Sequence, residues 1–200
     1  LLAFYAASMN FSFFEISLVT FLLAISGATS QWPTGKTSDS FDRRKVIIYS
    51  TFGAAFFAFC AIIASDQMYL PGDLATNRTW FYISLILFSV CSLPMFSLIL
   101  AHTNDFIPKE QFVAAGASLQ FTFGMGAMSG PFLCSIFMNI VGLNGFFVFL
   151  IFFHILIGAF GIYINTIRDV VDNPDSQFVA MPSSITPVGI ELSPAAEPID

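Results

Sequence analysis

Long apolar runs without charged residues alternate with short polar segments along this chain. Four stretches contain no Asp, Glu, Lys or Arg: residues 16–35, 46–65, 79–104 and 111–167. An α-helix needs about 20 apolar residues to cross the hydrocarbon of a bilayer, because it rises only about 1.5 Å per residue. The last run is long enough for two such helices, with a polar turn around residues 139–145. The pattern therefore predicts a bundle of transmembrane helices.

The predicted fold class is all-α, a polytopic transmembrane helical bundle. We predict five complete spans: residues 12–33, 46–65, 80–101, 112–138 and 146–167. A membrane β-barrel would alternate polar and apolar residues with a period of two, whereas these apolar runs are continuous. Ser12 and Glu15 have the spacing of a capping box, which satisfies free N–H groups where the first span begins.

The segment before these spans, residues 1–10, is apolar but too short to cross a membrane. The chain also starts without Met. A secretory signal peptide is the alternative, but the segment has no basic start and no convincing small-residue cleavage site. We therefore expect residues 1–10 to be the end of a sixth helix that is truncated inside the membrane.

The composition excludes an ordinary soluble domain. Hydrophobic residues make up 56% of the 200 residues and charged residues only 10%, whereas soluble domains carry about 25% charged residues. The same hydrophobicity excludes disorder for the apolar part of the chain. The net charge of −6 and the lack of a basic run beyond residues 43–45 argue against a nucleic-acid partner. The expected partner is a lipid bilayer.

Positively charged residues concentrate on one side of the predicted bundle. Six of the seven lie on that side: Lys36, Arg43, Arg44, Lys45, Lys109 and Arg168. Only Arg78 lies on the other side. Cytoplasmic loops carry the excess of Lys and Arg in membrane proteins, so we expect the first side and the C-terminus to be cytoplasmic.

Residues 168–200 differ from the rest of the chain. They contain five prolines and six carboxylates but a single basic residue. This composition predicts a disordered, acidic, Pro-rich cytoplasmic tail, with a regulatory or partner-binding segment as the alternative.

The sequence offers little chemistry for a metal or a nucleotide. Cys60, Cys91 and Cys134 fall inside the spans and their spacing fits no zinc or haem motif, so we expect buried, inert thiols. Residues 35–37 read Gly-Lys-Thr, but a phosphate loop also needs a glycine where Ser30 stands and a preceding strand. We expect no metal and no cofactor.

The segment between the first two spans carries the most specific motif. Residues 31–44 read Gln-Trp-Pro-x-Gly-x-x-Ser-Asp-x-x-Asp-Arg-Arg. This stretch resembles the signature loop of the Major Facilitator Superfamily, Gly-x-x-x-Asp-Arg-x-Gly-Arg-Arg, in the variant found in a branch of uncharacterised bacterial permeases. Ser40 replaces a basic residue of the general signature and Asp42 replaces a glycine; the second change belongs to the branch variant. The matching residues are Gly35, Asp39, Asp42, Arg43 and Arg44.

We interpret this loop as a conformational latch. Gly35 permits a tight loop, and the Asp39 carboxylate can lie against a helix N-terminus, where free N–H groups favour an anion. Arg43 and Arg44 can pair with carboxylates or with lipid phosphates. In the family, the partner helix belongs to the other half of the transporter. The alternative is that the basic residues only anchor the topology.

The fourth complete span is rich in glycine. It contains Gly124, Gly126 and Gly130, followed by Pro131. Small residues four positions apart let helix backbones approach closely in lipid, and proline opens a local kink. In the family, a Gly-x-x-x-Gly-Pro helix near the interface of the two halves is associated with antiporters. The resemblance implies a flexible gating helix, with simple helix packing as the alternative.

Two polar side chains lie deep within the predicted spans. His154 is ionisable at membrane depth, which makes it a functional candidate, and Gln120 is the other. Both could line a substrate or proton path, or only hydrogen-bond to a neighbouring helix. A third match to the permease branch lies around His102 and Asp105. We expect His102 at the membrane interface, with proton sensing as the alternative.

The resemblance covers residues 1–167 and implies the C-terminal six-helix half of a twelve-helix permease, with its first helix truncated and the N-terminal half missing. Such transporters bind a small solute near the midplane between two halves and expose it alternately to each side. The expected function is therefore secondary transport of a small-molecule substrate in a bacterial inner (plasma) membrane, proton- or ion-coupled or uniport, and not catalysis. A non-transporting membrane subunit and an intramembrane enzyme are the alternatives.

Overall fold

The computed structural model describes residues 1–67 and 74–167, and all regular structure in these two ranges is helical. The elements are α1 (Leu2–Ser8), α2 (Phe13–Ser40), α3 (Arg43–Gln67), α4 (Leu74–Ser92), α5 (Met95–Asn104), the 3₁₀ turn η1 (Lys109–Gln111), α6 (Phe112–Val141) and α7 (Gly145–Ile167). Five apolar segments are long enough to cross a membrane. The predicted all-α membrane bundle is confirmed. The predicted tail, residues 168–200, lies outside the described residues.

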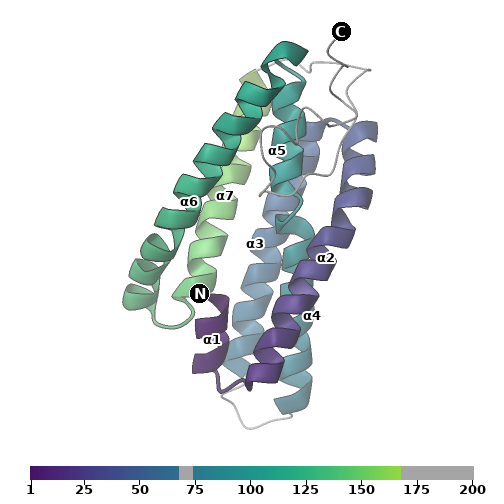
Figure 1. The fold of residues 1–200 in the computed structure, drawn as a ribbon. Coiled ribbons are helices and arrows are strands. Elements are labelled where there is room, and N and C mark those ends of the chain that lie inside the picture. The colour runs from purple at the N-terminus through teal and green to yellow at the C-terminus, as the bar shows by residue number, and fades with distance from the viewer. Residues whose placement is uncertain (68–73, 168–200) are drawn as a thin grey trace.

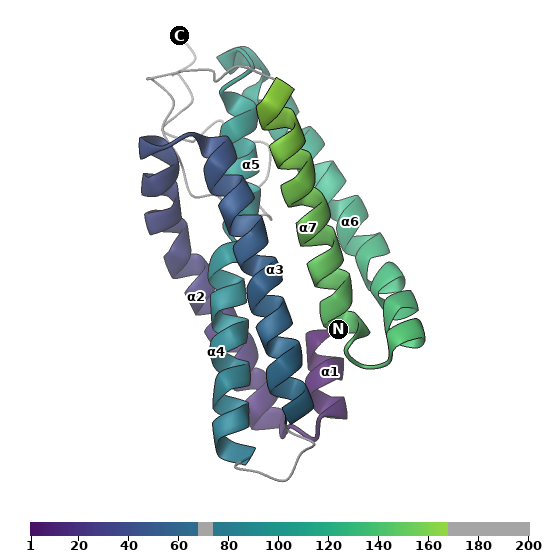
Figure 2. The same ribbon diagram turned by 180° about the vertical axis from the view of Figure 1, so that it is seen from behind.

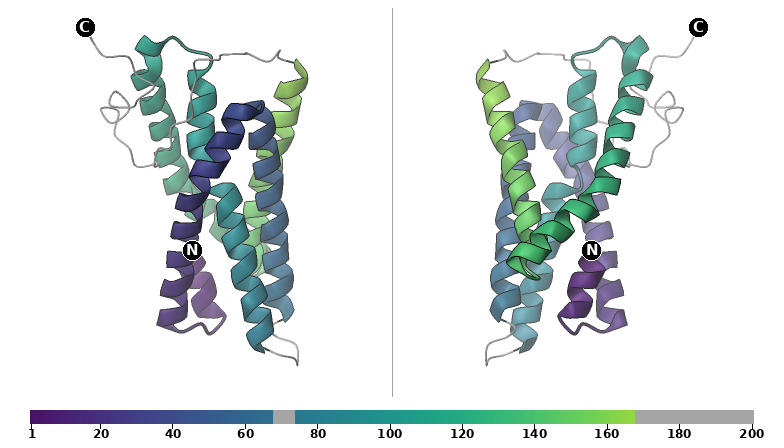
Figure 3. Two further views of the ribbon diagram at one scale, coloured as in Figure 1. Left: turned by 90° about the vertical axis from the view of Figure 1, so that its right-hand side faces the viewer. Right: turned by 90° about the vertical axis from the view of Figure 1, so that its left-hand side faces the viewer.

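Helix α3 occupies the middle of the bundle and packs against α4 on one side and α7 on the other (Figures 1 and 2). Helix α2 packs against α4, and α6 contacts α7 at the edge of the bundle. The short helix α1 lies beside the start of α2, at the end of the bundle away from the α2–α3 turn (Figure 3). The connection from α1 to α2 passes through Asn10, whose φ of 59° is the left-handed conformation that commonly ends a helix.

The predicted capping box at the start of α2 is confirmed. The Ser12 hydroxyl accepts a hydrogen bond from the Glu15 backbone N–H at 3.3 Å, and the Ser12 N–H donates to the Glu15 carboxylate at 2.8 Å. Two N–H groups that the helix itself leaves free are thereby satisfied.

Helix α2 continues well beyond Pro33, the residue at which its span was predicted to end. It includes Pro33 in its interior and ends at Ser40, so that only Phe41 and Asp42 connect it to α3. Proline removes one backbone hydrogen bond, but membrane helices tolerate this loss when their surroundings compensate. Consequently, the segment expected to be a loop is largely helical.

The predicted span 80–101 is made of two helices. Helix α4 ends at Ser92 and α5 begins at Met95, with Leu93 and Pro94 between them. Pro94 has no N–H to continue the ladder of α4. The chain restarts immediately, since the Leu98 N–H donates to the Pro94 carbonyl at 3.0 Å. Helix α6, in contrast, continues through Pro131.

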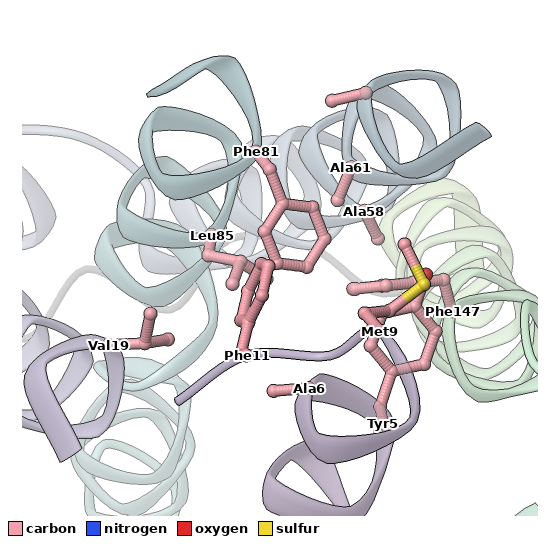
Figure 4. Close-up of a cluster of buried hydrophobic side chains, with 11 residues drawn as sticks. Tyr5, Ala6, Met9, Phe11, Val19, Ala58, Ala61, Phe81, Leu85 and Phe147 are labelled. Atoms are coloured by element: carbon pink, nitrogen blue, oxygen red, sulfur yellow. The ribbon is translucent and has the colours of Figure 1, made fainter. Parts of the chain in front are cut away.

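Aromatic rings fill the core at the end of the bundle where α1 lies (Figure 4). The Tyr5 and Phe147 rings meet edge to face at a centroid distance of 4.9 Å, and Phe81 lies 6.0 Å from Phe147. Ala58 and Ala61 of α3 are fully buried against this cluster. Their small side chains let the rings approach the α3 backbone, as expected for helices that associate in lipid.

Candidate functional site

At the other end of the bundle, charged side chains connect three helices. Arg43 is the first residue of α3, and its Nη2 lies 3.0 Å from Asp39 Oδ1 in the last turn of α2. Its Nε lies 3.2 Å from Oδ2 of Asp105, the residue that follows α5. One guanidinium thus holds the end of α2 and the end of α5 to the start of α3, using the fork of donors that suits arginine for such sites.

Most of these charged groups are withdrawn from solvent. Arg43 is 8% exposed, and the Asp105 side chain 9%, whereas the Asp39 side chain is 35% exposed. Burying two charges costs about as much as their attraction returns, while removing one partner leaves a buried charge uncompensated. The Arg43–Asp105 pair therefore adds little net stability, but removing either residue alone should strongly destabilise the protein.

Asp42 has a local role that its place in the motif did not suggest. Its Oδ1 accepts from the Arg44 backbone N–H at 3.0 Å and from Arg44 Nε at 3.3 Å. A carboxylate at this position satisfies the free N–H groups of a helix start and complements its dipole. Asp42 caps α3 and holds the Arg44 side chain, which is itself buried. We refer to Asp39, Asp42, Arg43, Arg44 and Asp105 as the ionic cluster.

The structure brings four of the five predicted latch residues into this cluster, and the fifth, Gly35, is buried in α2. Sequence reasoning missed Asp105 as the partner of Arg43. The signal was present, because Asp105 follows a predicted span at the same end of the bundle as residues 36–45. Nothing in the sequence spacing showed that the end of α5 would approach the start of α3, since this is a tertiary contact.

The glycines of α6 lie on an open face. No other described atom, beyond the glycines' own chain neighbours and the α6 backbone around them, comes within 4 Å of a Cβ placed on Gly124, Gly126 or Gly130. Close approaches occur instead at other glycines of the described residues. A Cβ on Gly27 would overlap Leu93, and one on Gly158 would lie 2.9 Å from the Phe52 ring.

His154 and Gln120 have different surroundings. His154 Nε2 lies 3.1 Å from the Ser92 hydroxyl at the end of α4, and its Nδ1 lies 2.7 Å from the Leu150 carbonyl of its own helix. The edge of the ring also contacts Phe88 at a centroid distance of 5.4 Å. Gln120 Oε1 is buried, and it has no hydrogen-bond partner within the described residues.

A second polar set, at the end where α1 lies, escaped the sequence analysis. The Asn144 amide donates to Asp66 Oδ1 at 2.6 Å, and its oxygen accepts from the Tyr5 hydroxyl at 3.0 Å and the Ser65 hydroxyl at 3.3 Å. Glu15 and Arg78 form an ion pair at 2.5 Å. Asn144 had been interpreted only as a turn residue, and Glu15 only as a cap.

Metal-binding chemistry is not found in the part of the chain that the structure describes. Cys60, Cys91 and Cys134 carry free thiols. No group of three His, Cys, Asp or Glu side chains there is arranged to hold a metal ion.

These features define a polytopic helical membrane protein with a charged contact between helix ends on one side of the bundle. The family model of the Major Facilitator Superfamily matches residues 1–194. The chain therefore belongs to the Major Facilitator Superfamily, a family of membrane transporters, as its motif predicted. No curated protein and no solved structure matches the chain in comparable searches.

Proposed function

We propose that the chain is the C-terminal six-helix half of a secondary transporter that moves a small solute by alternating access. Family membership supports transport in general. The observation that carries the finer proposal is the pair of contacts made by Arg43, which joins the ends of α2 and α5 to the start of α3 through carboxylates. In transporters of this architecture, one half rocks against the other around a central site. The Arg43 contacts lie within this half, so in this proposal they form and break when α5 moves relative to α2 and α3 during that rocking.

The ionic cluster acts as the latch in this proposal. When the end is closed, Arg43 is compensated by Asp39 and Asp105. When it opens, water replaces the lost contacts, and the hydration of the separated charges offsets their lost attraction. A contact of this kind can therefore reverse at a small net free energy.

The end of the bundle with the ionic cluster is cytoplasmic in this proposal, and so is the C-terminal tail. The basic residues at this end favour that orientation. The membrane is then the inner (plasma) membrane of a bacterium, as in the permease branch that the motif resembles. A cysteine placed at the exposed Lys36 should react with a membrane-impermeant maleimide only from the cytoplasmic side. Reaction from the outside alone would reverse the topology.

Coupling to a proton or ion gradient rests on the two polar residues within the bilayer. An ionisable side chain at membrane depth is costly and is a functional candidate by default. His154 supplies such a group, and the Gln120 carbonyl oxygen is available to a solute hydroxyl or ammonium group. The open glycine face of α6 is the proposed contact with the N-terminal half, where close approach requires small residues.

The test is transport by the full-length protein in proteoliposomes. Uptake of a panel of radiolabelled solutes is measured with and without an inward proton gradient, with an internal pH-sensitive dye as a second readout. We expect one solute class to exceed protein-free vesicles and Arg43→Gln to lower its rate at equal insertion. Inserted wild-type protein that moves no solute in the panel, or that is unaffected by Arg43→Gln, would contradict the proposal.

A further inference from the structure

The break between α4 and α5 lies where three neighbouring helices hold the chain. The Ser89 hydroxyl donates to the Leu23 carbonyl of α2 at 2.6 Å. Leu93, at the break itself, packs on Gly27 of the same helix. Cys91 contacts Gly53 of α3, since its sulfur would lie 3.1 Å from a Cβ at that position. These contacts fix the end of α4 to α2 and α3.

The contact between this break and α7 is of a different kind, because it is made by the His154 imidazole, which can gain a proton. Ser92 is the last residue of α4, and its hydroxyl lies 3.1 Å from His154 Nε2. In the neutral ring, Nδ1 carries the hydrogen and donates to the Leu150 carbonyl, so that Nε2 accepts from the Ser92 hydroxyl. Adding a proton to Nε2 reverses this bond, because Ser92 must then accept and its own hydrogen loses its acceptor.

The protonated ring would also add a positive charge beside the carboxyl end of a helix. The last carbonyls of α4 carry partial negative charge, and Pro94 supplies no N–H to satisfy the carbonyl four residues before it. A cation on His154 therefore attracts backbone groups that the neutral ring does not. The two protonation states favour different arrangements of the residues around Ser92 and Pro94.

No charged side chain competes for this role on the helices around His154. The charged residues of the neighbouring helices stand near helix ends: Arg43, Arg44, Lys45 and Asp66 on α3, and Arg78 on α4. Helices α6 and α7 contain no Asp, Glu, Lys or Arg. The remaining titratable groups on α3, α4 and α6 are the thiols Cys60, Cys91 and Cys134 and the phenols Tyr49 and Tyr82.

We infer that His154 is a positioning residue whose protonation, transmitted through Ser92, changes the angle between α4 and α5. The inference rests on the proposed transport function. In it, the proton acts at the break between α4 and α5, which we call the hinge, and not on the solute. Helix α5 is attached beyond the hinge by Asp105 to Arg43, and the Ser97 hydroxyl lies 3.5 Å from Gln31 Oε1 of α2. A change of angle at Pro94 would therefore move Asp105, at the far end of α5, towards Arg43 or away from it.

The experiment measures the position of α5 directly. Spin labels are attached to cysteines at Thr103 of α5, whose hydroxyl donates to the Ile99 carbonyl of its own helix, and at Tyr49 of α3, which is 74% exposed. The native cysteines are replaced by alanine in the full-length protein. Distances between the labels are then recorded by pulsed electron resonance between about pH 5 and pH 8, the range in which histidine titrates.

We expect two distance populations whose ratio changes with pH, by at most about tenfold per unit because a single proton is linked to the change. His154→Gln and Ser92→Ala should abolish the pH dependence. Ser84→Ala is the matched control, because the Ser84 hydroxyl donates to the Trp80 carbonyl of α4 itself. His102→Gln is the control for the other histidine. Both controls should retain the response.

The result would overturn the inference if His154→Gln and Ser92→Ala kept the wild-type pH response, or if His102→Gln removed it. The second variant keeps the test decisive should His154→Gln fail to insert. Transport is measured in the same preparations. Transport without a His154-dependent distance change rejects the hinge and leaves the transporter standing. A His154-dependent distance change without transport of any solute rejects the proposed function and leaves the hinge standing.

Discussion

The two ends of the bundle are closed by different chemistry. At one end, Arg43 joins α2, α3 and α5 through carboxylates. At the other, the rings of Tyr5, Phe81 and Phe147 pack together around α1. Packed rings gain from every contact and lose them all on separation, whereas separated charges regain hydration. The comparison indicates an end that can open and an end that stays closed within this half.

The end that contains Tyr5, Phe81 and Phe147, which we call the aromatic end, also holds polar groups. The Asn144 amide is neutral, and its donor and acceptor are both engaged, by Asp66, Tyr5 and Ser65. These bonds connect α1, α3 and the start of α7. Among the described residues, the charges at this end are the partly exposed Glu15–Arg78 pair and the exposed Asp66. The aromatic end is therefore expected to respond to mutation mainly in stability, and the ionic end mainly in transport.

The largest stability loss is expected from Phe81→Ala. The Phe81 ring is 1% exposed and contacts the rings of Tyr5, Phe11 and Phe147. Replacing a buried Phe by Ala costs about 3–5 kcal/mol in soluble cores. We expect about 3 kcal/mol here, because an apolar side chain gains less from burial between helices when the alternative is lipid and not water. Thermal unfolding in detergent measures the loss. The control Phe160→Ala removes a ring that is 63% exposed, and equal losses in both variants would refute the assignment.

Arg43→Gln is expected to be next, with its main effect on transport. It leaves the buried Asp105 carboxylate uncompensated, which we expect to cost about 2 kcal/mol, less than a fully buried pair because Asp39 is partly exposed. Transport should fall at least tenfold. Arg43→Lys, which keeps the charge but not the fork of donors, should be intermediate. A loss of stability as large as that of Phe81→Ala with normal transport would reverse the comparison.

Asn144→Ala tests the polar contacts at the aromatic end. It removes the hydrogen bonds to Tyr5, Ser65 and the charged Asp66, and it leaves the buried Ser65 without this acceptor. We therefore expect the free energy of unfolding to fall by about 1–2 kcal/mol. Transport per inserted molecule should stay near the wild-type rate. Asn139→Ala, at an exposed position of α6, is the control in the same unfolding assay. A strong transport defect in Asn144→Ala would show that this end also moves.

The smallest effect is expected from Asp39→Asn. This substitution keeps the size of the side chain and removes its charge, but the Asp39–Arg43 pair is of the i,i+4 type and 35% exposed at Asp39. Such pairs contribute about 0.3–0.5 kcal/mol, so we expect transport to slow about twofold with insertion intact. Unaltered uptake kinetics would remove Asp39 from the latch and leave the Arg43–Asp105 pair as the proposed contact.

The number and order of the membrane helices could be predicted from the sequence because charge-free runs of sufficient length have few other solutions. The helix breaks could not. Pro33 and Pro131 lie inside continuous helices, whereas Pro94 separates α4 from α5. The sequence alone does not distinguish the proline that breaks a helix from the two that do not. What distinguishes Pro94 is tertiary, since Leu93 packs on Gly27 and Asp105 holds the far end of α5.

The candidate site was predictable in composition but not in pairing. The motif supplied Asp39, Arg43 and Arg44, because its residue types are specific. The pairing of Asp105 with Arg43 was not predicted, since it is a tertiary contact between residues that are far apart in the chain. Glycine spacing also failed to identify the close contacts within the described residues, because packing at Gly27 or Gly158 requires one small residue opposite a large one, without a repeat.

The most direct test of the central claim is a double-mutant cycle of transport rates with Arg43→Gln, Asp105→Asn and both together. If the pair is a reversible charged contact, each single variant leaves one charge uncompensated, and the double variant removes that penalty. The account predicts that the double variant transports faster than the product of the two single effects. Independent effects that multiply would contradict a latch formed by Arg43 and Asp105.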